Sequence, residues 1–164
     1  MIVGNGDIAS ILKDKDDKLY FASGVSNSAE TRKSEYQREI SLLLRQDGHV
    51  VYFSSLCVFY LDTPYAQHKR HIEELIKCNF KRHTILRLGN INWGDNPHTL
   101  INYLKNKIKN NEPFEIQNTH RYIVGKEEFL HWINLIPDWN CEINIPGEIL
   151  TISEIVRRIK LCKI

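Results

Sequence analysis

The stretch that decides the fold runs from His49 to Lys69 and reads HVVYFSSLCVFYLDTPYAQHK. Its apolar run, Val50 to Phe53, is typical of a strand buried on both faces of a parallel sheet. The strand ends in two serines, of which Ser55 is the second, and a short loop leads into a helix carrying Tyr65 and Lys69. The phenol and the ammonium lie one turn apart on one helix face. Together with the strand-end hydroxyl they form a group able to carry out proton chemistry.

Strand-like and helix-like segments alternate on both sides of this stretch. Leu19 to Ala22 and Thr84 to Leu88 are further apolar runs of strand length. The segment 34–46 has apolar residues at the spacing of an amphipathic helix, namely Tyr36, Ile40, Leu43 and Leu44. This alternation over the first ninety residues predicts an α/β fold, with a parallel sheet and helices on both faces.

The remainder of the chain predicts a smaller unit of mixed structure. Helices are expected over 97–108 and 126–136, and strands over 122–124 and 141–145. Thr151-Ile152-Ser153-Glu154 is a capping box that predicts the start of a last helix. We expect residues 96–164 to form a small C-terminal α+β lobe, packed on a core of residues 1–95 in one compact unit.

Composition narrows the class of protein. The chain has 164 residues, of which 42% are hydrophobic and 26% charged, so it can build one full core. A net charge of +2 with interspersed signs gives no electrostatic footprint for nucleic acid or an anionic membrane. No apolar run is long enough to span a bilayer, and a signal peptide is not expected at the N-terminus. The four cysteines, whose spacing does not suggest a zinc site, indicate free thiols in a reducing, cytoplasmic compartment.

A glycine-rich loop follows the first short apolar segment. Gly4-Asn5-Gly6-Asp7-Ile8-Ala9 has the pattern GxGxxA, and Ile8, Ile11 and Leu12 have helical spacing. A strand, a glycine turn and a helix in this order are the context of a dinucleotide-phosphate loop. The helix N-terminus would then offer N–H groups and its positive dipole end to a pyrophosphate. Taken alone the pattern is weak, because Gly-Asn-Gly is also common turn chemistry.

The order of the motifs carries more information than any one of them. The glycine loop is followed by a strand ending in Ala22-Ser23-Gly24, the strand ending in Ser54-Ser55, Tyr65-x-x-x-Lys69, and Leu86-Arg-Leu-Gly-Asn90. This order resembles the short-chain dehydrogenase/reductase superfamily, and more closely its extended branch of NAD-dependent nucleotide-sugar epimerases, dehydratases and reductases. The resemblance covers nearly the whole chain and implies a Rossmann-like fold.

The resemblance implies roles for the central residues. Tyr65 would be the general acid or base at a carbonyl or alcohol oxygen, and Ser55 would hydrogen-bond the same oxygen. Lys69 would bond the nicotinamide ribose, and its charge, together with an oxidised nicotinamide ring, would lower the pKa of Tyr65 toward neutral pH. The implied cofactor is NAD or NADP, and the residues expected to hold it are Gly4, Asn5, Gly6, Asp7, Ile8, Ala22, Ser23, Gly24 and Lys69.

The implied substrate is a nucleotide-sugar or a similar small molecule with a carbonyl or alcohol group. Asn90 and Arg121 are the candidate substrate-binding residues, and a guanidinium fork suits a phosphate. A surface salt bridge is an alternative role for Arg121. No metal site is expected, and a homodimer is implied through the helices at 34–46 and 65–79.

Departures from the family pattern leave a second function open. The strand that would carry an acidic residue for the ribose is missing after the glycine loop, so the fold is expected to be truncated and NAD cannot be told from NADP. Leu56-Cys57 replaces the acidic pair of dehydratases, which argues against 4,6-dehydration. Tyr-x-x-x-Lys is also common by chance. The alternative is a catalytically reduced member that acts as a dinucleotide-sensing or protein-interaction module.

Three neighbours of the central group have simpler interpretations. Ser54 is expected to be a hydrogen-bonding residue at the strand end and not a catalyst. His68 and His71 are expected to be surface residues, because the sequence offers them no evident carboxylate partner.

Overall fold

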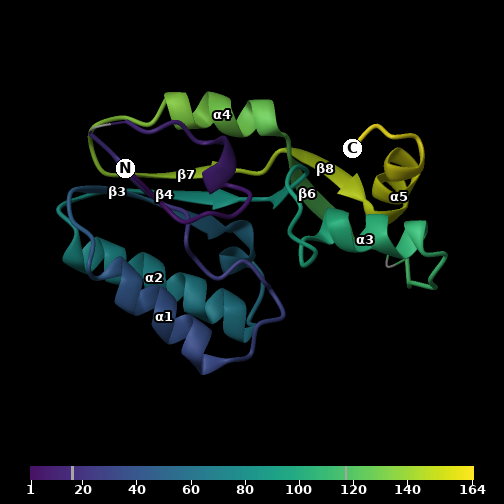
Figure 1. The fold of residues 1–164 in the computed structure, drawn as a ribbon, viewed down its shortest axis with the longest axis horizontal. Helices are drawn as coiled ribbons and strands as arrows, with labels where there is room; N and C mark the ends of the chain where they lie inside the picture. Colours follow the sequence, from purple (N-terminus) through teal and green to yellow (C-terminus); the bar gives the residue numbers. More distant parts are fainter. Residues whose placement is uncertain (16, 117) are drawn as a thin grey trace.

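A five-stranded parallel sheet organises the chain (Figure 1). The structure is a computed structural model that describes residues 1–15, 17–116 and 118–164. The strand order is β1-β2-β3-β4-β7 and every pairing is parallel. The strands are β1 (Ile2–Val3), β2 (Leu19–Phe21), β3 (His49–Ser55), β4 (Arg82–Leu88) and β7 (Cys141–Ile145). The predicted Rossmann-like α/β fold is confirmed, and β1 forms one edge of the sheet.

Helices cover both faces of this sheet (Figure 1). On one face lie α1 (Lys33–Leu43) and α2 (Pro64–Asn79), and on the other lies α4 (Lys126–Asn134). The start of α2 is fixed locally, because the Thr63 side chain accepts a hydrogen bond from the Ala66 N–H and Pro64 occupies the first turn. The helix that carries Tyr65 and Lys69 therefore begins at a defined point after β3.

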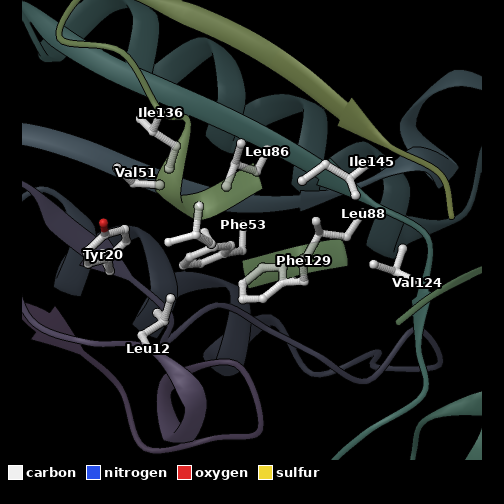
Figure 2. Packing of buried hydrophobic residues seen from close by; sticks show 11 residues of the cluster. Leu12, Tyr20, Val51, Phe53, Leu86, Leu88, Val124, Phe129, Ile136 and Ile145 are labelled. Atoms are coloured by element: carbon white, nitrogen blue, oxygen red, sulfur yellow. The ribbon is translucent and has the colours of Figure 1, made fainter. Parts of the chain in front are cut away.

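The core beneath α4 joins the N-terminal segment to the rest of the sheet (Figure 2). Phe129 of α4 is fully buried, and its ring centroid lies 5.8 Å from that of Phe53 and 5.2 Å from that of Trp93. Leu12, which follows the glycine loop, packs into the same cluster with Tyr20. Burial of these side chains holds the glycine loop against the carboxyl end of the sheet.

A smaller sheet forms the lobe at the end toward which the strands of the large sheet point (Figure 1). It contains β5 (Asn90–Ile91), β6 (His120–Val124) and β8 (Glu148–Thr151), and carries α3 (Leu100–Lys109) and α5 (Ile152–Lys160). The capping box is confirmed: the Thr151 side chain accepts from the Glu154 N–H and the Glu154 side chain accepts from the Thr151 N–H. The α+β lobe is thus closed by a well-capped terminal helix.

The sheets do not divide the chain at residue 95. Strand β7 and helix α4 come late in the sequence but belong to the large sheet, whereas β5 comes before residue 95 and pairs with β6. The chain therefore passes between the two parts several times. The expected division into a core of residues 1–95 and a lobe of residues 96–164, packed in one compact unit, stays a prediction.

Candidate active site

A cavity of about 1370 Å³ lies between the carboxyl ends of the large sheet and the lobe. This is the position where ligands bind in open α/β sheets, and the volume is ample for a small-molecule ligand. Every residue predicted for the site lines it except Gly4; the lining members are Asn5, Gly6, Asp7, Ile8, Ala22, Ser23, Gly24, Ser55, Tyr65, Lys69, Asn90 and Arg121. The motifs scattered along the sequence therefore meet around one space.

The glycine loop approaches β2 closely at Gly4. Gly4 has φ +128°, and a Cβ there would lie 2.4 Å from the Ala22 carbonyl oxygen, so only glycine fits. Gly6 faces open space. Within the described residues the backbone N–H groups of Gly6, Asp7 and Ile8 make no hydrogen bond, which leaves these donors for an anionic ligand.

The prediction of an α-helix after this loop is wrong. Only a 3-10 helix of three residues, Ala9–Ile11, follows the loop. Asp7 explains part of this geometry, since its carboxylate accepts from the backbone N–H groups of Asp95 at 3.0 Å and Asn96 at 3.2 Å. Tertiary bonds to the lobe thus shape the segment, and a long helix dipole does not point at the cavity.

Tyr65 and Lys69 lie on one face of α2, as their spacing predicted. The Lys69 Nζ atom is 5.6 Å from the centroid of the Tyr65 ring. The hydrogen bonds of Nζ go elsewhere, to the Tyr52 hydroxyl at 2.9 Å and the Glu39 Oε1 atom at 3.3 Å. The ammonium is therefore paired with a carboxylate within the protein.

The lowering of the pKa of Tyr65 was expected from Lys69 together with an oxidised nicotinamide ring, and without that ring the pKa of Tyr65 is shifted in the opposite direction. Burial raises the pKa of Tyr65 well above its ordinary value, and the Cys57 thiol and the Glu39 carboxylate act in the same direction. Tyr65 is therefore a protonated phenol at neutral pH in this state of the chain.

Glu39 of α1 is a buried neighbour of Lys69 that the sequence analysis missed. Its side chain is fully buried and its carboxylate accepts from the Val25 N–H at 2.7 Å and the Tyr52 hydroxyl at 2.7 Å, in addition to Lys69. Burial opposes its ionisation, but the charge of Lys69 and the hydrogen bonds lower the pKa of Glu39 to about 2. One signal was present in the sequence: Glu39 lies three residues after Tyr36, on the apolar face of its helix.

His68 is buried, which corrects the expectation that it is a surface residue. Its Nε2 atom lies 2.9 Å from the Glu39 Oε2 atom, and its ring stacks on Tyr36 with 4.4 Å between centroids. The carboxylate partner comes from a helix 29 residues earlier, so no local pattern could reveal it. His71 is exposed, as expected.

Ser54 and Ser55 serve different purposes. The Ser54 hydroxyl donates to Glu73 Oε1 at 2.6 Å, which confirms its role as a buried hydrogen-bonding residue. Glu73 is in turn paired with Arg87 of β4. The Ser55 Oγ atom accepts from the Cys57 N–H at 3.3 Å and lines the cavity, where a hydroxyl can also donate to a ligand.

The lobe and its junction with the large sheet provide Asn90 and Arg121, the predicted substrate-binding residues. The Asn90 amide donates to the Tyr122 carbonyl at 3.1 Å, and the Arg121 guanidinium donates to the His120 carbonyl at 2.9 Å. Among residues 1–15, 17–116 and 118–164, these contacts leave further donors of both side chains unused. A second guanidinium, Arg38 of α1, lines the cavity near Ser23 and was not predicted.

Neither a membrane span nor a metal centre is present in the part of the chain that the structure describes. None of its described helices is both long enough and apolar enough to cross a bilayer. Among the same residues, no group of three or more histidine, cysteine or acidic side chains is placed to hold a metal ion.

The low pKa of Glu39 predicts a specific pH dependence of stability. A carboxyl whose pKa is lower in the folded than in the unfolded chain stabilises the fold above pH 4.5, and this stabilisation is lost as the pH falls toward 2. When the pH is lowered from 5 to 2, the unfolding free energy of the parent should therefore fall by roughly 3 kcal/mol more than that of Glu39→Gln, because one pKa unit corresponds to about 1.4 kcal/mol. Urea denaturation at each pH measures this. Glu74→Gln, an exposed change, is the control, and parallel curves for Glu39→Gln and the parent would contradict the assignment.

Solved structures share this fold, although no protein-family model and no curated protein matches the sequence. WbmG of Bordetella bronchiseptica, in complex with NAD and UDP, superposes with a TM-score of 0.65 at 14% identity, covering 90% of this chain and 56% of that one. UDP-glucose 4-epimerase of Thermus thermophilus, in complex with NAD, gives 0.66 at 13% identity, covering 90% and 62%. The capsular polysaccharide assembling protein CapF of Staphylococcus aureus gives 0.59 at 20% identity, covering 90% and 45%.

The chain thus spans between 45% and 62% of the length of these three structures. At such identities the likeness concerns the fold. It agrees with the fold that the order of motifs in the sequence implies. The chain has a Rossmann-like fold, similar to that of these NAD-complexed and epimerase structures but shorter.

Proposed function

We propose that the cavity binds NAD or NADP together with a nucleotide-sugar or similar substrate, and that the chain is an oxidoreductase or epimerase. The observation that carries this proposal is the meeting of the predicted residues around one cavity at the carboxyl ends of the strands. The structural neighbours crystallised with NAD, and in one case with UDP as well, support the same class of ligand.

The residues of the cavity fit a dinucleotide at its pyrophosphate. The free N–H groups of Gly6, Asp7 and Ile8 would hold this group, and the open space at Gly6 lets it approach the backbone. Ala22, Ser23 and Gly24 would line the adjoining ribose. A bound dinucleotide supplies hydride transfer.

The side chains of the chain itself would handle the proton. Tyr65 would exchange it with the oxygen of the reacting carbonyl or alcohol, and Ser55 would donate a hydrogen bond to that oxygen. Lys69 uses two donors within the protein and has a third to offer to a ribose hydroxyl. Asn90 and Arg121 would orient the substrate, with the Arg121 guanidinium on a phosphate.

Cofactor binding is the first test. NAD(H) or NADP(H) at millimolar concentration should raise the melting temperature of the chain, because a ligand that binds only the folded state stabilises it. Gly6→Ala should remove much of the increase, since its methyl group enters the space meant for the pyrophosphate. Gly125→Ala is the matched control: its Cβ also meets nothing within 4 Å, but Gly125 does not line the cavity. No increase with either dinucleotide would refute the proposal.

A second function is favoured by one observation. The ammonium of Lys69 is already compensated by Glu39, and the pKa of Tyr65 is raised, so the chain could bind cofactor without turning over substrate. The chain would then be a dinucleotide-sensing or interaction module. Binding without turnover of any nucleotide-sugar would select this function. The homodimer and the cytoplasmic location stay predictions, and light scattering tests the first.

A further inference from the structure

Glu39 differs from an ordinary structural carboxylate in its partners. It is fully buried, and four donors converge on it: Lys69, Tyr52, His68 and the N–H of Val25. A neutral acceptor could satisfy the hydroxyl and the N–H. A charge in this position is costly unless a cation is paired with it, and Lys69 is that cation.

The ion pair is covered by the loop after β2. A Cβ at Gly24 would lie 2.8 Å from both the Glu39 Oε1 atom and the Lys69 Nζ atom, so the backbone at Gly24 passes directly over the pair and any larger residue would push these side chains aside. Lys69 itself is only 2% exposed, although it reaches the cavity wall. The pair is thus shielded from bulk water, and the two charges act on their surroundings with little screening.

Tyr65 lies within range of both charges. The ammonium lies 5.6 Å from the centroid of its ring, and it would favour the phenolate if it acted alone. The Glu39 carboxylate, 3.3 Å from the same ammonium, opposes this effect. The net charge of the pair is zero, so the phenol experiences little of the attraction that an isolated lysine would exert.

We propose that Glu39 is a positioning residue that sets the protonation state of Tyr65, by compensating the charge of Lys69 and holding its ammonium on Tyr52. Tyr65 therefore enters the reaction as a phenol that gives its proton to the oxygen of a substrate carbonyl. This inference rests on the proposed role of Tyr65 as the general acid or base.

Other groups around the phenol act in the same direction as burial. The Cys57 thiol and the Glu39 and Tyr36 side chains of α1 each raise the pKa of Tyr65 further. The groups that face Tyr65 and the ion pair are Tyr36 and Glu39 of α1, Tyr52 of β3, Cys57 of η2 (Leu56–Phe59), and His68, Lys69 and Glu73 of α2.

The test is the ionisation of Tyr65 in the folded full-length chain. Ultraviolet absorbance of phenolate is followed against pH, and the curve of the Tyr65→Phe variant is subtracted in each background. In Glu39→Gln the pKa of Tyr65 should fall by about 1–2 units relative to the parent, because the ammonium is no longer compensated. Glu39→Gln/Lys69→Gln should restore the parent value. Glu30→Gln is the control, since Glu30 is another buried carboxylate, paired with Arg32 and not with Lys69.

An unchanged pKa of Tyr65 in folded Glu39→Gln would overturn the inference. If that variant does not fold, Glu39→Asp takes its place, and its carboxylate, drawn back by one methylene, should give a smaller fall. The parent gives an independent test, because ionisation of Tyr65 below its ordinary pKa of about 10 would contradict full compensation. The titration needs no cofactor, so failure to bind a dinucleotide refutes the proposed function and leaves this result readable.

Discussion

Tyr65→Phe should lower kcat by about 10²–10⁴-fold, which is the contribution of a positioned general acid or base. The change removes one hydroxyl from the cavity wall and leaves the ring in place over Lys69. The fold and the melting-temperature increase caused by NAD should therefore stay close to those of the parent. The measurement is turnover of a panel of nucleotide-sugars with NAD or NADP.

Tyr60→Phe is the matched control for this loss of turnover. Tyr60 lines the same cavity, but it is exposed and lies in the loop before α2. Its removal should change kcat much less than that of Tyr65. If Tyr65→Phe turns over as fast as the parent, Tyr65 has no part in the proton transfer and the proposed mechanism is wrong.

Arg87→Met should destabilise the chain by about 3–5 kcal/mol, the cost of breaking a buried ion pair. Arg87 is 7% exposed and bonds the Glu73 carboxylate through Nε, at 3.0 and 3.1 Å, and through its terminal nitrogen. Without it, Glu73 stays buried with only the Ser54 hydroxyl as a partner on that side. Since a domain of this kind is stable by about 5–15 kcal/mol, much of the total would be lost.

The double variant Glu73→Met/Arg87→Met shows whether the loss comes from the orphaned charge. It removes both charges and fills the space with apolar atoms, so most of the stability should return. Urea unfolding of the parent, Arg87→Met and the double variant measures this. Equal stability of Arg87→Met and the parent would mean that Glu73 finds another partner or becomes protonated, and would contradict the role given to the pair.

Local sequence patterns predicted most elements of the large sheet. The apolar run of β3 and the apolar run of β4, which ends before Gly89, indicated buried strands. In the structure these strands run from His49 to Ser55 and from Arg82 to Leu88. Helix α2 was recognisable because Pro64 and its apolar stripe are adjacent in sequence. Strand β8 was missed, because its first two residues are exposed and its last two are more buried, so exposed and buried residues do not alternate along it.

The site was predictable wherever it depends on short spacings. Tyr65 and Lys69 share a helix face because four residues make about one turn. Ser55 and Gly24 reach the same cavity because parallel strands end at the same edge of the sheet. The helix expected after Gly6 was wrong, because Asp7 bonds the lobe backbone near Asp95, 88 residues later, and this contact has no signal near the glycines.

The sequence by itself determined the order of the strands and helices, the motifs at the strand ends and the placement of a phenol one turn before an ammonium. Only the tertiary structure decided what that ammonium does, because Glu39 meets Lys69 across 30 residues of chain and through the packing of α1 on α2 and β3. Spacing fixes which side chains share a face. The charge that acts on Tyr65, however, is a sum over all neighbours in space, and Glu39 cancels much of the effect that the sequence pattern predicted for Lys69.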